Sequence, residues 1–278
     1  MKKNILFTIM IIVILAVMCG CSTGETEKLP MATYLGGEET IDEITNELEG
    51  AGLSNLTDFQ NWVSDFAKTA GKTAGLKDSW EELSKLDFDS SKTMDGWEKN
   101  HDYSDSDCRM TAFLLMDGIL ESQEVEEKYD GTYLMFDMEA IDSVARYEKL
   151  KNKRALFTTI FGDEVIADGE NTKDKLGEIW KQYGIKVNNE KVSLLSLVIY
   201  DPDFKTIFVG HTGVLVTTDN GLLFVEKIAF EQPYQATRVN DMKELMEVLA
   251  KRGEYFGEQG ESGPYVYVNG EFYTELKK

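Results

Sequence analysis

The chain has 278 residues, of which 50 are Asp or Glu and 29 are Lys or Arg, so its formal net charge at pH 7 is −21. A chain this acidic repels phosphate backbones, which makes nucleic acid a poor candidate partner. It contains three cysteines and two histidines, which leaves few residues for thiol–imidazole chemistry.

The first twenty residues have the features of a secretion signal. Lys2 and Lys3 precede an apolar run that ends in Gly20-Cys21. A small residue before cysteine at the end of such a run is typical of lipoprotein processing, and the run is not a mature membrane span. We expect residues 1–20 to be a signal peptide and Cys21 to carry a lipid that anchors the chain to the cell membrane, facing outside the cytoplasm. Plain secretion with cleavage nearby is the alternative.

Removal of Cys19 and lipid attachment at Cys21 would leave Cys108 as the only free thiol, without a disulfide partner. An unpaired cysteine in an exported protein is either buried and inert or exposed and reactive. Both interpretations stay open at this point.

Two further regions follow the signal peptide. Residues 21–37 are expected to be a tether, because Ser22 to Gly37 is polar and small without periodicity. Residues 38–278 contain no internal repeat and no long linker, so one domain is expected there.

Helices are expected first. Thr40 and Glu43 have the spacing of a capping box, and Gly50 is placed to end that helix. The second helix has an amphipathic face at i, i+3, i+4 and i+7, made by Phe59, Trp62, Val63 and Phe66. Loops and short helical turns are expected between Gly71 and Asp107. Further helices are expected from Cys108, with Ala112, Leu115, Met116 and Ile119 on one stripe, and near Met138 to Leu150 and Thr172 to Tyr183.

From Lys191 onward, β-branched and aromatic residues dominate. Asn220-Gly221 is a hairpin signal, because Asn-Gly suits positive φ angles. Strands are expected at Val192 to Tyr200, Thr206 to Val209, Thr212 to Thr218 and Leu222 to Phe230, followed by a helix after Asn240 and a hairpin from Tyr265 to Phe272 around Asn269-Gly270. Helices followed by antiparallel strands describe an α+β fold, with N-terminal helices packed on a C-terminal antiparallel sheet.

Cys108 opens its helix, where unpaired backbone N–H groups and the macrodipole favour a thiolate. His211 lies far downstream on an expected strand, so any pairing of the two residues would be spatial. Asp107 at the N-cap position would partly oppose ionisation of the thiol.

Two further residues complete the candidate site. A two-residue loop at Asn220-Gly221 places Glu226 opposite Leu215 and therefore on the same sheet face as His211, so Glu226 is expected to orient His211. Pairing of Glu226 with Lys227 or another basic residue is the alternative. The backbone N–H of Cys108 and the hydroxyl group of Tyr103 are the candidate oxyanion donors.

The other polar residues predict no cofactor and no metal site. His101 precedes Cys108 by too few residues to face it across a cleft, so we expect a surface or loop histidine. The chain has no zinc-ligand spacing, no calcium loop and no glycine-rich phosphate loop.

Three segments carry a resemblance to known proteins. Asp107-Cys108-Arg109, the strand Gly210 to Leu215 and the sequence from Phe224 to Gln235 resemble an uncharacterised family of lipoproteins from Gram-positive bacteria, the domain-of-unknown-function family numbered 4300. That family brings no established activity.

Asp107-Cys108 and Gly210 to Val214 are also similar, more distantly, to the Asp-Cys and His-x-Gly-Val/Ile segments of NlpC-type papain-like amidases that cut cell-wall peptides. That similarity implies a papain-like arrangement with Cys108 as nucleophile, His211 as base and Glu226 as the orienting residue. The chain departs from the pattern at Arg109, where such enzymes have a small residue, and at Glu226, where they have His, Asn or Gln.

The leading hypothesis is therefore a membrane-anchored extracellular cysteine hydrolase or transferase of papain-like type, acting on amide bonds in a cell-wall or peptide substrate. The alternative is a non-catalytic surface lipoprotein that binds a peptide or glycan and keeps Cys108 in its core. Proximity of the Cys108 sulfur to the His211 ring distinguishes the two.

Overall fold

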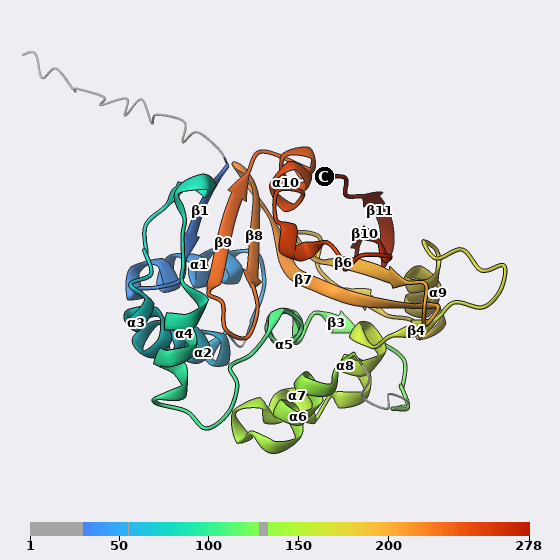
Figure 1. Ribbon diagram of the computed structural model, residues 1–278, viewed down its shortest axis with the longest axis horizontal. Coiled ribbons are helices and arrows are strands. Elements are labelled where there is room, and N and C mark those ends of the chain that lie inside the picture. Colours follow the sequence, from blue (N-terminus) through green and yellow to red (C-terminus); the bar gives the residue numbers. More distant parts are fainter. Residues whose placement is uncertain (1–29, 55, 128–132) are drawn as a thin grey trace, which may run out of the picture.

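The computed structural model describes residues 30–54, 56–127 and 133–278. Nine strands of this described part form one antiparallel sheet in the order β11-β10-β6-β7-β8-β9-β1-β2, with β4 beside β7 (Figure 1). Their bounds are β1 Met31–Tyr34, β2 Glu81–Glu82, β4 Glu164–Val165, β6 Val192–Asp201, β7 Thr206–Thr218, β8 Gly221–Lys227, β9 Tyr234–Val239, β10 Ser262–Val268 and β11 Glu271–Glu275. A separate pair is formed by β3 (Leu120–Glu121) and β5 (Lys186–Val187).

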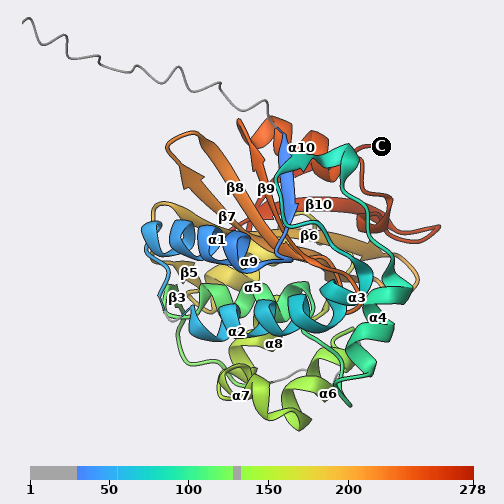
Figure 2. The same ribbon diagram turned by 90° about the vertical axis from the view of Figure 1, so that its left-hand side faces the viewer.

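The helices cover both faces of the sheet. Their bounds are α1 Glu38–Gly50, α2 Thr57–Phe66, α3 Lys72–Ala74, α4 Ser90–Glu98, α5 Cys108–Met116, α6 Met135–Ser143, α7 Glu148–Lys151, α8 Arg154–Phe161, α9 Lys175–Gln182 and α10 Met242–Leu249, with a π-helical turn η1 at Ala67–Gly71 and 3₁₀ turns η2 at Leu83–Lys85, η3 at Ala145–Tyr147 and η4 at Gly253–Tyr255. Helix α5 lies against β7 and β8 on one face, and α10 lies on the opposite face (Figures 1 and 2). Helices with an antiparallel sheet confirm the α+β class.

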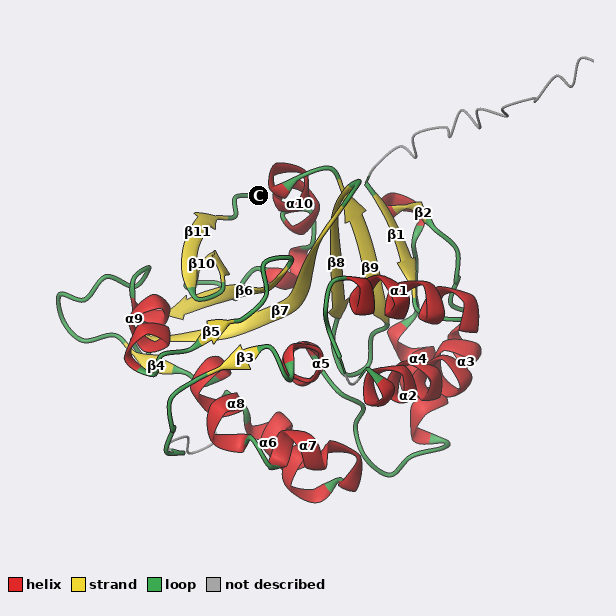
Figure 3. Ribbon diagram, turned by 180° about the vertical axis from the view of Figure 1, so that it is seen from behind, coloured by secondary structure: helices red, strands yellow, loops and turns green. Residues whose placement is uncertain are grey.

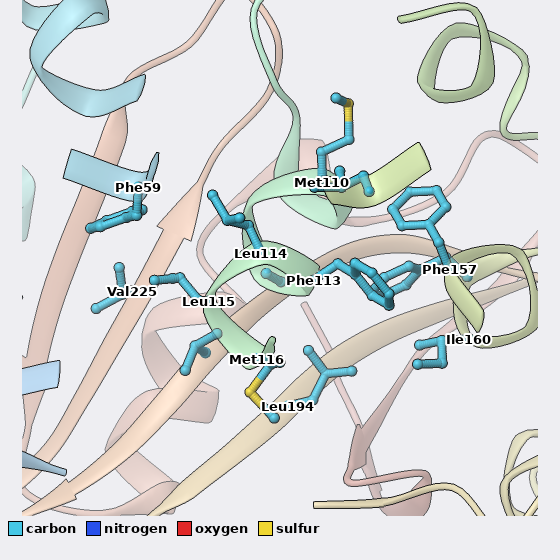
Figure 4. Packing of buried hydrophobic residues seen from close by; sticks show 14 of the residues in the cluster. Phe59, Met110, Phe113, Leu114, Leu115, Met116, Phe157, Ile160, Leu194 and Val225 are labelled. Carbon is cyan, nitrogen blue, oxygen red and sulfur yellow. The ribbon is translucent and has the colours of Figure 1, made fainter. Parts of the chain in front are cut away.

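Two buried clusters fill the two sides of the sheet. On the α5 face, Val214 and Val225 pack with Leu115, and the surrounding apolar side chains enclose α5 (Figure 4). On the α10 face, Leu215 and Phe224 pack with residues of α10 and η4. Neighbouring residues of one strand thus belong to different clusters, as the alternation of side chains along a strand requires.

Most expected helices form. The four apolar residues of α2 are buried, and α5 begins at Cys108 as expected. The capping box at Thr40 is wrong, because α1 already begins at Glu38 and the Thr40 hydroxyl donates to Gly37 O. Glu43 is therefore free to bind Arg238. The single helix expected from Met138 to Leu150 is instead α6, η3 and α7.

The folded region begins earlier than expected. The predicted tether extended to residue 37, but Met31–Tyr34 forms β1 and pairs with β9 (Figure 3). The sequence did not reveal this strand because its partner, Tyr234–Val239, was also not predicted. The predicted signal peptide and the lipid site at Cys21 lie outside the described residues.

A β-bulge interrupts β7. Its register with β6 pairs His211 with Leu197 but Val209 with Val198, so Gly210 is the extra residue. The two strands expected on either side of this position are therefore one strand. The bulge shifts the alternation of side chains by one residue, so Val209 faces α5 whereas His211 faces α10.

The β7–β8 hairpin has a different register from the one expected. Leu215 pairs with Phe224, not Glu226, and the turn residues are Asp219 and Asn220. Gly221 instead begins β8 with φ of 130°, and a Cβ there would lie 2.3 Å from Val239 O. A shift of two residues preserves the face, so Glu226 and His211 do lie on the same side of the sheet.

No helix in the described ranges combines the length and the apolar character that a crossing of the bilayer would require.

Replacement of Leu115 by Ala should lower the free energy of unfolding by about 2–5 kcal/mol, because the side chain is fully buried in the α5 cluster. Urea unfolding at neutral pH measures this change. Met135→Ala is the control, because its exposed side chain should cost no more than about 0.5 kcal/mol. Equal costs for both variants would show that α5 is not a core helix.

Candidate functional site

Cys108 is buried at the first residue of α5, with 5% of its surface exposed. Asp107 caps the helix by accepting a hydrogen bond from Met110 N at 2.9 Å, as the sequence predicted. Burial raises the pKa of the Cys108 thiol and Asp107 raises it further, while the charge of Arg109 and the N–H of Thr212 only partly offset the rise. Desolvation thus outweighs the helix dipole, so Cys108 is a neutral thiol at neutral pH.

Arg109 fixes Cys108 against the bulge of β7. Its Nη1 donates to Val209 O at 3.0 Å, and its Nε and Nη2 donate to the Asp137 carboxylate at 2.9 and 2.7 Å. Its Nη2 also lies 2.9 Å from Asp107 Oδ2. Burial and the neighbouring Asp137 raise the pKa of Asp107 to about 8. Arg109, the first departure from the papain-like pattern, is therefore a largely covered structural residue.

His211 lies on the other face of the sheet. Its Nε2 is 2.7 Å from Glu226 Oε2, and its ring stacks on Tyr255 with 4.1 Å between centroids. Cys108 instead contacts groups on the α5 face. The structure thus joins His211 to Glu226, as expected, but does not bring Cys108 and His211 together. The reason is the alternation of side chains along β7, because Val214 and Val216 face α5 and His211, like Leu215, therefore points to the opposite face.

Tyr103 also lies apart from the expected site. Its hydroxyl group is 3.5 Å from Arg146 Nη1, and its ring lies beside Trp97 and His101. His101 follows α4 in a loop, as expected, but its ring is largely covered because it stacks on Trp97 and its Nε2 is 3.0 Å from Asp65 Oδ2. Neither residue is a neighbour of the Cys108 thiol among its described contacts.

Four polar side chains from four adjacent strands line up on the α10 face: Tyr34, Gln235, Glu226 and His211, here called the polar row. Tyr34 is the register partner of Gln235, and Gln235 is the register partner of Glu226. Each of the four is 3% exposed or less. A buried line of polar groups is costly unless each group has a partner, so its contacts carry information.

Glu226 is the centre of the polar row. Besides His211, it accepts hydrogen bonds from Tyr255 Oη at 2.6 Å and from Gln235 Nε2 at 3.2 Å, and Arg252 Nη2 lies 3.6 Å away. Burial alone would raise the pKa of Glu226, but Arg252, His211 and Tyr255 together hold it below its usual value. A charged carboxylate therefore holds Gln235, Arg252 and His211 in fixed orientations.

A cavity of about 530 Å³ opens onto the β1 end of the polar row, and we call it the row cavity. Tyr34, Gln235 and Arg252 line it together with the apolar residues Leu86, Phe88 and Val248. Its volume is within the range of small-ligand sites.

Two polar atoms of residues that line the row cavity have no hydrogen-bond partner among the described residues, although the side chains that carry them are largely buried. Tyr34 Oη forms no hydrogen bond with any described residue, and Gln235 uses only its Nε2, which donates to Glu226 and Thr237. Gln235 Oε1 therefore has no described partner either. Neither atom is among the enclosed buried atoms without a partner, so both retain contact with solvent and are available to a ligand in the cavity.

The sequence did not identify Tyr34, Gln235 or Arg252 as site residues. Tyr34 and Gln235 lie on β1 and β9, which were not predicted, and Arg252 follows α10. These three residues come together only when the strands pair, and no local sequence pattern predicts that pairing. Within the described residues, no group of three His, Cys, Asp or Glu side chains is arranged to hold a metal ion.

Cys108 should resist iodoacetamide in the native protein at neutral pH and react once the protein is unfolded in urea. The reason is the raised thiol pKa and the burial of the sulfur. Mass spectrometry of the chain lacking residues 1–21 measures the labelling, with Ser54→Cys as an exposed positive control. Rapid native labelling that slows in His211→Gln would instead establish a thiol–imidazole pair.

The stability difference between the wild type and Glu226→Gln should be largest at neutral pH and shrink as the pH falls below about 4.5, the usual pKa of the group. The folded-state pKa of Glu226 is lowered, so the stability from its charge is complete above the unfolded-state pKa and is lost as the pH falls through the folded-state pKa. Chemical denaturation at several pH values measures this difference. The exposed variant Glu271→Gln is the control, and a difference that stays constant down to about pH 3 would refute the ionised, bonded carboxylate.

Comparison with known proteins gives a family but no activity. The family model for a domain of unknown function, DUF4300, matches residues 31–273. The chain matches no curated protein and no solved structure. The match begins at β1 and ends within β11, so it includes the polar row and the residues around Cys108. The chain therefore belongs to the DUF4300 family.

Proposed function

We propose that this protein is a non-catalytic surface lipoprotein that binds a peptide, and that the row cavity holds one amide group of that peptide. The observation that carries the proposal is that Tyr34 Oη and Gln235 Oε1 have no described hydrogen-bond partner and belong to residues that line the same cavity as Arg252.

The available groups match the two ends of an amide. A peptide carbonyl accepts hydrogen bonds, which Tyr34 Oη and Arg252 can donate, and a peptide N–H donates, which Gln235 Oε1 can accept. Gln235 Nε2 donates hydrogen bonds to Glu226 and Thr237, so Gln235 Oε1 is the end of the side-chain amide that remains free for a ligand. The acceptor is thus oriented before a ligand arrives, which lowers the entropic cost of binding.

The walls of the row cavity favour a peptide over a glycan. Leu86, Phe88 and Val248 provide apolar surface next to the polar groups. An amide flanked by an aliphatic or aromatic side chain buries that side chain against such walls. A glycan would place hydroxyl groups there and leave them without partners.

In this proposal His211 and Glu226 are positioning residues. Glu226 holds Gln235 and Arg252, and His211 holds Glu226 from the far side. Their contacts extend from β7 to the cavity at the β1 end of the polar row. The same two residues that suggested catalysis thus support recognition.

A papain-like hydrolase of the NlpC type is the other function that the sequence predicts. It requires the Cys108 thiol beside the His211 imidazole. The Cys108 thiol is buried on the α5 face of the sheet and its pKa is raised, whereas His211 lies on the α10 face. This arrangement favours a binding protein without catalytic activity. The lipid at Cys21 is part of the proposal and would hold the binding domain at the outer surface of the membrane.

Isothermal titration of the chain lacking residues 1–21 with N-acetyl-leucine methylamide and N-acetyl-phenylalanine methylamide tests the proposal. We expect binding of at least one of these compounds, and a rise in Kd of roughly two- to tenfold in Tyr34→Phe and in Gln235→Leu, the value of one hydrogen bond. Tyr273→Phe, which removes an exposed hydroxyl group on β11, should leave Kd unchanged. Absence of binding by both compounds, or equal Kd values in all variants, would refute amide recognition at the row cavity.

A further inference from the structure

A second cavity of about 540 Å³ lies between α4, the loop before α5, α6 and the loop from β8 to β9. It shares no lining residue with the row cavity. Its lining combines aromatic and acidic side chains, and we call it the aromatic–acidic pocket.

The aromatic part of this pocket contains side chains that a folded protein usually covers. Phe136 is 63% exposed, and its ring packs edge-on against Phe230 with 6.5 Å between centroids. Met94 is also exposed at the same pocket. Grouped exposed apolar residues around a cavity mark a surface that another molecule covers.

The acidic part consists of Glu98, Asp102, Asp105 and Glu231. Asp105 is buried and its charge is matched by Lys227, whose Nζ lies 2.9 Å from Asp105 Oδ2. The side chains of Glu98, Asp102 and Glu231 form no ion pair with a described residue. None of the described residues that line the pocket is Lys or Arg.

We infer that the aromatic–acidic pocket binds a lysine or arginine side chain of a partner polypeptide. A cation is attracted to the faces of Phe136 and Phe230 and to the unpaired carboxylates beside them. Both the cation–π contact and the attraction to the carboxylates require a positively charged ligand, because the aromatic faces and the carboxylates repel an anion. The net charge of −21 adds long-range attraction for a basic partner.

Neighbouring contacts decide which rings can receive the cation. The Trp97 ring is already stacked by His101 at 3.7 Å and has the Arg146 guanidinium 5.3 Å from its centroid. The Tyr103 ring packs edge-on against Trp97, His101 and Tyr147, which leaves Phe136 and Phe230 as the available rings. Arg146 does not oppose a ligand cation strongly, because its charge is paired with Asp65 at 2.9 Å.

Two exposed methionines indicate which kind of residue lies next to the basic residue in the partner. Met94 lines the pocket, and Met135 precedes Phe136 in α6 with its side chain 55% exposed. An apolar residue next to the basic one would cover them and remove apolar surface from water. The partner segment therefore has a basic residue next to an apolar residue.

Two matched peptides test this inference by isothermal titration: N-acetyl-Lys-Leu-amide and N-acetyl-norleucyl-Leu-amide, which differ only in the terminal ammonium group. Both carry the same amides, so any binding in the row cavity is common to them. We expect the lysine peptide to bind roughly two- to thirtyfold more tightly, the range of a cation–π contribution. The difference should shrink between about 50 and about 500 mM salt, because exposed carboxylates are screened.

Variants assign that difference to the pocket. Phe136→Ala, and Glu98→Gln combined with Asp102→Asn, should each reduce the preference for lysine, whereas Tyr34→Phe should keep it. Glu178→Gln combined with Glu271→Gln removes the same charge elsewhere and should also keep it. Equal affinity of the two peptides, binding of neither, or a lysine preference that survives both pocket variants would overturn the inference.

Discussion

The extra residue in β7, Gly210, determines the face of the sheet to which each part of that strand belongs. On one side of the bulge, Val209 offers its carbonyl oxygen to Arg109, which holds the start of α5 in place. Two residues later, on the other side of the bulge, His211 faces α10 and meets Glu226. The thiol and the imidazole lie in different environments because His211 alternates with Val214, which faces α5, while the bulge lets Val209 face α5 as well.

The polar row depends on this placement. Glu226 is charged and buried, which is tolerable only because His211, Tyr255, Gln235 and Arg252 surround it. A satisfied buried network of this kind stiffens its members. The stiffness extends to Gln235 and Arg252, which face the row cavity. The same interaction therefore stabilises the sheet and orients the groups that we propose for amide recognition.

Local signals predicted the elements that local interactions form. The apolar spacing of Phe59 to Phe66 predicted α2, and the cap at Asp107 predicted the start of α5. Strands β1 and β9 have no such signal, because they are short and are stabilised by pairing with each other. The bulge at Gly210 arises from the register with β6, which the sequence of β7 alone does not contain. The pairing of His211 with Glu226 was predictable from strand parity, whereas the separation of Cys108 from His211 was not.

The measurement that tests this account most directly is a two-dimensional NMR titration of the isotope-labelled chain lacking residues 1–21 with N-acetyl-phenylalanine methylamide. The account predicts that the side-chain signals of Gln235 and Arg252 shift in a saturable way, together with backbone signals of β1 and β9. It also predicts that the signals of Cys108 and Thr212 do not move. Saturable shifts centred on Cys108 and Thr212, with Gln235 and Arg252 unaffected, would contradict it.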